Sequence, residues 1–454
     1  MASTTPASPN LLDILLHYGI FDSVCSNFDI KDLLAMRLVS KTLSVNYSAH
    51  RNARWDVNRY LRRFVRDPRS LRSLMARKNA VIAGSFVIQF LDGVLWPATS
   101  LDILVRREDD HDDNPPTIGV EGLDLNKDRD ISVNLTADFG KHLCETEGYE
   151  KTRDVKESEF THLPRLGVNR VGRWAGVDRY EDYVRAETET TPEAKICIMF
   201  TRGDPVEHIL KYNRATQVMN FITWNKAYSL FPDITFLKPR EQHRLQNRDY
   251  LSAKFLDRYE QRGWKVANTI RPSERFPPSI YPTRRIGDAR CWTVALNTDG
   301  VEAAEIPDFV LELGQFDLKL EFGYIKVSAY LIDYPSFKYQ YIVGLEAYDK
   351  NFWVHYVSEK MQDLNGVELK KWEVTEKRES LRQLFKAECG WISWASGGGG
   401  NRRRPEKVPE TWTFYDHLLP GWHEEWQKQC KLNESANGPS VLVFGDRGVR
   451  KLPR

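Results

Sequence analysis

The residues of this chain that could carry chemistry are a glycine–serine pair and one aspartate on neighbouring predicted strands. Gly84-Ser85 follows the apolar run 80–83, and Asp102 lies inside a second apolar run, 101–105. A Gly-Ser turn that opens a helix presents backbone amides to a phosphate group. A carboxylate on an adjacent strand can hold a magnesium ion when further oxygen ligands join it. Taken alone, such a Gly-Ser turn is a weak signal of phosphate binding.

Asp102 lacks a second carboxylate on its own face of the strand. Its neighbours two positions away are Ser100 and Leu104, and the predicted third strand, 195–200, contains no acidic residue. Magnesium that transfers phosphoryl groups needs charge from several oxygens. We therefore expect no metal site, no cofactor and no catalytic residue here.

The order of strand, Gly84-Ser85, helix and a strand bearing Asp102 resembles the nucleotidyltransferase fold. That family has a Gly-Ser or Gly-Gly pair and then an Asp-x-Asp strand. The resemblance implies a mixed-sheet core over residues 78–270 with a degenerate nucleotide site at Gly84, Ser85 and Asp102. The alternative is an active nucleotidyltransferase or nucleotide-binding protein, in which Asp109 or Asp110 folds back to supply a second carboxylate.

The N-terminal segment 11–74 has apolar residues at helical spacing almost throughout. Asp29 stands where a helix N-cap is expected, with Asp32 in the first turn. Short helices of this size cannot bury all their apolar surface among themselves, so a remaining stripe favours a partner. We expect that stripe to comprise Ile20, Phe21, Val24, Phe28, Leu33, Leu34, Leu38 and Val39.

Residues 20–43 resemble the F-box. Asp32-Leu33-Leu34 and the run 37–41, Arg-Leu-Val-Ser-Lys, are similar to the family's motifs, and Trp55 fits its later tryptophan. The usual Leu-Pro opening is replaced by Tyr18-Gly19. The resemblance implies docking to a Skp-type adaptor of a cullin–RING ubiquitin ligase, with the rest of the chain presenting an unknown target protein. The alternative is a scaffold unconnected with a ligase, in which the stripe packs on the α/β body.

A further block is similar to proteins of filamentous fungi that pair an F-box-like start with this degenerate core. It comprises residues 219–224, 227–232 and 235–236, so the resemblance extends over about 20–236.

Composition excludes several classes of function. The 454 residues carry 65 basic and 63 acidic side chains, so no overall field attracts nucleic acid, and we expect no nucleic-acid partner. No stretch has the apolar length of a membrane span, and the N-terminus lacks a signal peptide. Six scattered cysteines without paired spacing indicate a reducing compartment, the cytoplasm or the nucleus.

The pattern along the chain predicts an α+β or α/β fold. We expect a flexible lead (1–10), F-box-like helices (11–74), the nucleotidyltransferase-like core (78–270), an antiparallel β-rich region (271–395) and a linker with a C-terminal segment (396–454). Helices are predicted at 86–91, 139–147, 206–210, 215–230 and 240–262. Period-two alternation predicts strands within 309–334 and 339–357. The charged stretch 151–192 is predicted to be loop-like, with strands inside it as the alternative.

Overall fold

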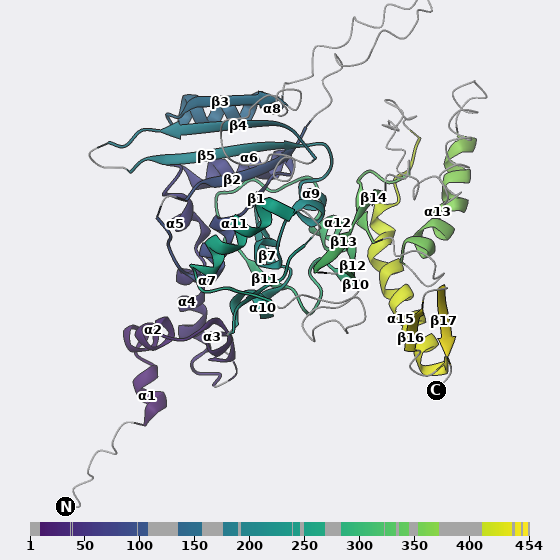
Figure 1. The fold of residues 1–454 in the computed structure, drawn as a ribbon, viewed down its shortest axis with the longest axis horizontal. Helices are drawn as coiled ribbons and strands as arrows, with labels where there is room; N and C mark the ends of the chain where they lie inside the picture. Colours follow the sequence, from purple (N-terminus) through teal and green to yellow (C-terminus); the bar gives the residue numbers. More distant parts are fainter. Residues whose placement is uncertain are drawn as a thin grey trace, which may run out of the picture. The chain divides into compact units, whose positions relative to one another are not determined.

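The chain folds into a mixed α+β structure, given by a computed structural model (Figure 1). The structure describes residues 10–36, 38, 40–97, 99–107, 135–156, 176–188, 192–237, 239–245, 249–267, 283–321, 323–332, 336–344, 353–371, 411–437, 441–445 and 448–452. The chain divides into two compact units. The first comprises Met1–Pro282, Gly287–Glu305 and Leu318–Val327, and the second comprises Thr283–Ile286, Ile306–Asp317 and Ser328–Arg454.

Short helices open the first unit, as the periodicity predicts. They are α1 (Leu11–Leu15), α2 (Tyr18–Ser26), α3 (Ile30–Met36), α4 (Ser44–Arg54), α5 (Val57–Leu61) and α6 (Pro68–Lys78). Asp29 accepts a hydrogen bond from the Asp32 amide, as an N-cap does. The Asp67 side chain caps α6, and Pro68 occupies its first turn, where its missing N–H costs nothing. The Asp-Pro pair therefore starts a helix, whereas the preceding helix α5 already ends at Leu61.

An eight-stranded mixed sheet follows, in the order β11-β7-β6-β1-β2-β5-β4-β3. Its strands are β1 (Val81–Ala83), β2 (Leu101–Arg106), β3 (Glu150–Lys156), β4 (Val177–Arg185), β5 (Ala194–Thr201), β6 (Asn220–Ile222), β7 (Lys226–Ser229) and β11 (Trp292–Ala295). Strand β2 runs antiparallel to β1 and parallel to β5. Figure 1 shows β3, β4 and β5 side by side at one end of the sheet.

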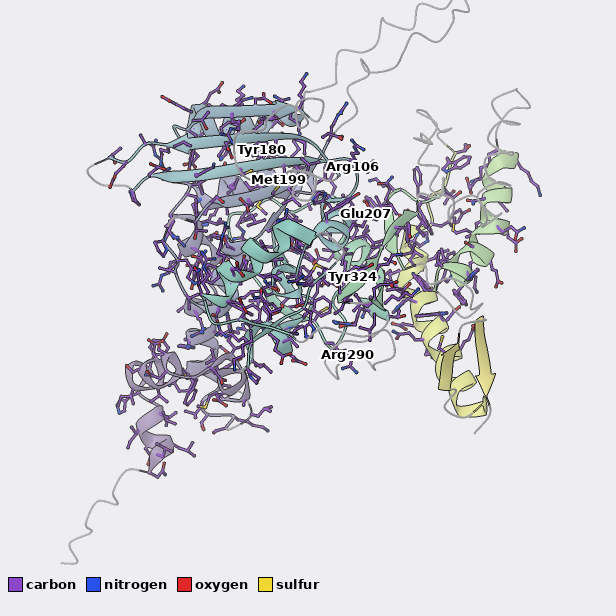
Figure 2. All side chains as sticks on the ribbon, in the orientation of Figure 1. Arg106, Tyr180, Met199, Glu207, Arg290 and Tyr324 are labelled. Atoms are coloured by element: carbon purple, nitrogen blue, oxygen red, sulfur yellow. The ribbon has the colours of Figure 1, made fainter. Side chains whose placement is uncertain are left out.

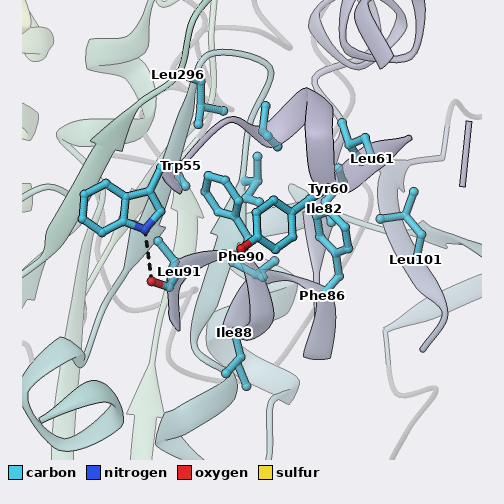
Figure 3. Close-up of a cluster of buried hydrophobic side chains, with 14 of the residues drawn as sticks. Trp55, Tyr60, Leu61, Ile82, Phe86, Ile88, Phe90, Leu91, Leu101 and Leu296 are labelled. Carbon is cyan, nitrogen blue, oxygen red and sulfur yellow. Dashed lines mark hydrogen bonds between the residues drawn. The ribbon is translucent and has the colours of Figure 1, made fainter. Parts of the chain in front are cut away.

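The main core lies between one face of this sheet and the helices. Ile82, Ile103 and Ile198 are paired on β1, β2 and β5 and are fully buried. Helix α7 (Ser85–Asp92) packs there: the Phe90 ring meets Tyr60 edge-to-face, with centroids 5.4 Å apart (Figure 3). The predicted succession of strand, helix and strand is confirmed.

Within the charged stretch 151–192, the described residues include strands β3 and β4, so the alternative of strands holds there and not the loop. Charged side chains of β3 form ion pairs with charged side chains of β4, so a highly charged segment can still form the edge of a sheet. Arg179 donates to Asp154 over 2.8 Å, and Lys151 donates to Glu181 over 3.0 Å. The register places Asp154 opposite Glu181 and Lys156 opposite Arg179, so these ion pairs join diagonal neighbours and offset the repulsion between the like charges that face one another.

Two other expectations are wrong. The segment 215–230 forms the β6–β7 hairpin and not a helix, because Phe221 and Ile222 lie beside β1, and a short buried run shows no period. Residues 353–357 were expected to be strand, but they form the start of helix α13 (Trp353–Lys370). Trp353, Val357 and Met361, four residues apart, form one buried face of that helix.

The other elements of the first unit are α8 (Leu135–Lys141), a π-helical turn (His142–Thr146), α9 (Pro205–Tyr212), a 3-10 turn (Thr216–Val218), α10 (Pro232–Phe236), β8 (Glu241–Gln242), α11 (Asp249–Glu260), β9 (Lys265–Val266) and β13 (Tyr324–Ser328). Helix α11 is thus shorter than the predicted 240–262. Among the residues described, no helix is both long and apolar enough to cross a bilayer.

The second unit has a small core of its own. Its elements are β10 (Thr283–Arg285), α12 (Asp308–Glu312), the start of β12 (Gln315–Glu321), β14 (Tyr330–Ile332), β15 (Tyr341–Val343), α13, a 3-10 turn (Asp416–Leu418), α15 (Leu419–Asn437), β16 (Val441–Gly445) and β17 (Gly448–Leu452). Phe337, Tyr341 and Trp353 are buried together in this core. Residues 271–395 are therefore divided between the two units.

Candidate functional site

The apolar residues expected to face an adaptor separate into buried and exposed groups. Phe21 and Leu33 are fully buried in the main core, which corrects the expectation that they belong to an open stripe. The reason is that Phe21 lies on the face of α2 toward α4, where its ring meets His50 edge-to-face at 6.4 Å. Ile20 and Leu38, in contrast, are 44% and 79% exposed.

The remaining predicted residues fall between these cases. Val24 and Phe28 are partly buried and pack against the core. Leu34 lies on α3, but its side chain lies outside the described residues, as does Val39. Among the predicted residues whose side chains the structure describes, Ile20 and Leu38 are thus the most exposed.

Sequence reasoning missed a larger set of exposed apolar side chains beside α2. They are Leu11, Leu12, Ile14, Leu16, Tyr18 and Val45. The signal was present, because the run 11–16 is almost wholly apolar, yet α1 buries only Leu15. We call these six residues, with Ile20 and Leu38, the N-terminal apolar set.

Hydrogen bonds hold these helices in place. The Asn46 side-chain amide on α4 donates to the carbonyls of Leu15 and Leu16, at 3.0 and 2.9 Å. Asp22 Oδ1 on α2 lies 2.7 Å from His50 Nδ1 on α4. These contacts fix α1 and α2 against α4, so the exposed side chains project from an anchored group of helices.

Gly84 and Asp102, two of the residues predicted to form a degenerate nucleotide site, lie close together. Gly84 precedes α7 with φ 77° and ψ −153°, and a Cβ built on it would lie 2.8 Å from Asp102 Oδ2. Only glycine adopts this backbone conformation readily. Ser100 Oγ donates to the other carboxylate oxygen of Asp102 over 2.9 Å. Gly84 and Asp102 therefore lie close together at the start of α7, where Ser85 is the first residue of the helix.

The strands around Asp102 carry little further acidity. The register places Cys197 of β5 beside Asp102, and Asp182 of β4 beside Cys197. Asp182 already accepts hydrogen bonds from Tyr180 Oη at 2.7 Å and from Lys195 Nζ at 3.1 Å. Figure 2 labels Tyr180 and its β5 partner Met199 at this part of the sheet.

Electrostatics near these carboxylates follow from burial. Burial raises the pKa of Tyr180 to about 12, and its hydrogen bond to Asp182 acts in the same direction. Burial also raises the pKa of Tyr259 on α11, and the nearby charge of Asp102 adds to that shift. Both phenols are therefore neutral at physiological pH, and Tyr180 acts as a hydrogen-bond donor to Asp182.

Asp109 and Asp110, the predicted sources of a second carboxylate, lie outside the described residues. Within the described part of the chain, no three His, Cys, Asp or Glu side chains gather as they would around a metal ion. What the described geometry offers is one carboxylate beside a helix start.

Comparison with protein-family models, with curated proteins and with solved structures finds no match to this chain.

Proposed function

We propose that this chain is a non-catalytic recognition subunit whose N-terminal helices dock a Skp-type adaptor of a cullin–RING ubiquitin ligase. In this proposal the sheet-containing body and the second unit present a target protein. The observation that carries it is the exposure of Ile20 and Leu38 together with the other members of the N-terminal apolar set. Six members of this set lie within residues 11–20, and exposed apolar residues gathered in one segment cost free energy in water and are typical of protein-binding surfaces.

The anchoring of these helices supports the same proposal. Trp55, at the end of α4, is buried and donates its indole N–H to the Leu91 carbonyl over 3.1 Å. Arg54 donates to the neighbouring Asp92 carbonyl over 3.0 Å. A docking module held to its body in this way can place a bound target at a defined position relative to the adaptor.

Binding of the purified chain to a purified Skp-type adaptor, measured by titration calorimetry, tests the proposal. The double variant Ile20→Asp/Leu38→Asp should weaken binding at least about tenfold, since two charges would be placed in an apolar interface. Both side chains are exposed, so the melting temperature should stay close to that of the parent. Leu95→Asp is the matched control, because Leu95 is 63% exposed but lies outside the N-terminal helices.

Equal binding by the double variant and the parent would overturn the adaptor proposal. Absence of binding by the parent would favour a scaffold that has no connection with a ligase.

The contact of Gly84 with Asp102 favours nucleotide binding as a second candidate function. A helix start beside a carboxylate suits a phosphate that is accompanied by a magnesium ion. Millimolar ATP with magnesium should then raise the melting temperature, by the linkage between binding and folding. The rise should be smaller in Asp102→Asn, and no rise in the parent would exclude this candidate.

A further inference from the structure

A cleft of about 570 Å³ lies in the first unit, and none of its lining residues belongs to either site described above. The N-terminal helices supply one wall, and α10 with β11 supplies the other. The lining residues that matter most are Tyr47, Arg51 and Trp55 on the first wall and Phe236, Arg290 and Trp292 on the second. This volume is within the range of small-molecule binding sites in proteins.

Aromatic rings form the inner surface of the cleft. Trp292 meets Trp55 edge-to-face with ring centroids 5.3 Å apart, and Phe236 in the same way at 5.5 Å. Trp55 and Phe236 are buried, whereas Trp292 remains partly exposed in the cleft. Three rings locked in this way give a rigid apolar wall, which suits a planar aromatic group.

The charged groups of the cleft favour an anion. Among its described lining residues, Arg51 and Arg290 are cationic and Asp233 is acidic. Both arginines are exposed, and Figure 2 labels Arg290. A guanidinium group stays charged at every physiological pH and donates hydrogen bonds that match a carboxylate or a sulfonate.

We propose that this cleft binds a small aromatic anion. The ring of the ligand would lie against Trp292, and its carboxylate or sulfonate would lie at Arg51 and Arg290. Because the walls come from the N-terminal helices and from the body, the ligand would bridge them. This inference does not depend on adaptor docking or on the nucleotide alternative.

The Cys291 thiol, which also lines the cleft, reports on occupancy. The full-length protein is treated with iodoacetamide, and alkylation of each cysteine is followed by peptide mass spectrometry. Naphthalene-2-carboxylate at millimolar concentration should slow alkylation of Cys291 several-fold. Cys144 and Cys430 are accessible thiols elsewhere in the chain, and their alkylation rates should not change.

Two comparisons separate the contribution of the anionic group to binding from the contribution of the ring. Naphthalene-2-carboxamide has the same shape without the charge and should protect Cys291 less than the carboxylate. In Arg51→Gln/Arg290→Gln, the difference between the two probes should disappear, with a melting temperature close to that of the parent.

Three results would overturn the proposal. Equal protection by both probes in the parent would mean that the cleft does not select an anion. Unchanged Cys291 alkylation with either probe would mean that it does not bind the ring, and equal slowing at Cys144 and Cys430 would mean that the effect is nonspecific.

Discussion

Trp55 and Leu91 join the N-terminal helices to α7 through one hydrogen bond from the indole N–H to the carbonyl, 3.1 Å long (Figure 3). Leu91 lies in the last turn of α7, where carbonyls have no partner within the helix. Both residues are buried, so the bond forms away from water. A tryptophan that the F-box resemblance singled out therefore has a defined structural task, the attachment of α4 to the body.

Trp55→Phe removes the donor but keeps an aromatic ring in the core. The Leu91 carbonyl would be left buried and unpaired, so we expect the free energy of unfolding to fall by about 1–3 kcal/mol. Urea unfolding followed by circular dichroism measures the change. An unchanged midpoint would show that this bond does not hold the two parts together.

Gly84→Ala should destabilise the protein by about 1–3 kcal/mol, because its backbone conformation suits only glycine. The new methyl group would also lie 2.8 Å from Asp102 Oδ2. Combining it with Asp102→Ala removes that clash but not the backbone strain. The loss in free energy of unfolding, measured by thermal unfolding, should therefore be smaller in the double variant than the sum of the losses in the two single variants. Strict additivity would argue against contact between the two residues.

Arg240 and Asp92 form a two-pronged ion pair, with both N–O distances 2.8 Å and 6% exposure of the Asp92 side chain. Arg240→Ala would leave a buried carboxylate without this partner, at an expected cost of about 3–5 kcal/mol. Arg77→Ala is the control: its pair with Glu302 is exposed on both sides and should contribute about 0–1 kcal/mol. Urea unfolding measures the free energy of unfolding, and similar losses for Arg240→Ala and Arg77→Ala would contradict this reasoning.

The free energy of unfolding should fall in mild acid because of the protonation of His423, which lies in the second unit. Burial against Trp353 lowers its pKa to about 4, and the charge of Arg285 adds to the effect. The unfolded chain binds this proton near pH 6.5 while the folded chain does not, so stability declines as pH falls from about 6.5 to about 4. His423→Gln should reduce this decline in melting temperature, whereas exposed His417→Gln should not. Equal declines in the parent and His423→Gln would remove this explanation.

The sequence by itself determined the strand, helix and strand around Gly84 and the position of Asp102 beside it. These features are local: the apolar runs are short, Gly84-Ser85 separates the first strand from the helix, and antiparallel pairing of adjacent strands brings Asp102 opposite Ala83. The capped start of α3 was readable for the same reason, since a cap involves residues close in sequence.

Only the tertiary structure decided which apolar residues remain exposed. Ile20 and Phe21 are consecutive and equally apolar, yet one is 44% exposed and the other is fully buried, because α4 covers one side of α2. Helical periodicity defines the faces of a helix but not which neighbour covers each face. The β6–β7 hairpin and the charged β3–β4 ladder likewise depend on partners distant in sequence. Such strands form when the pairing strand supplies hydrogen bonds and opposite charges. The local sequence pattern does not predict which segment of the chain will be that pairing strand.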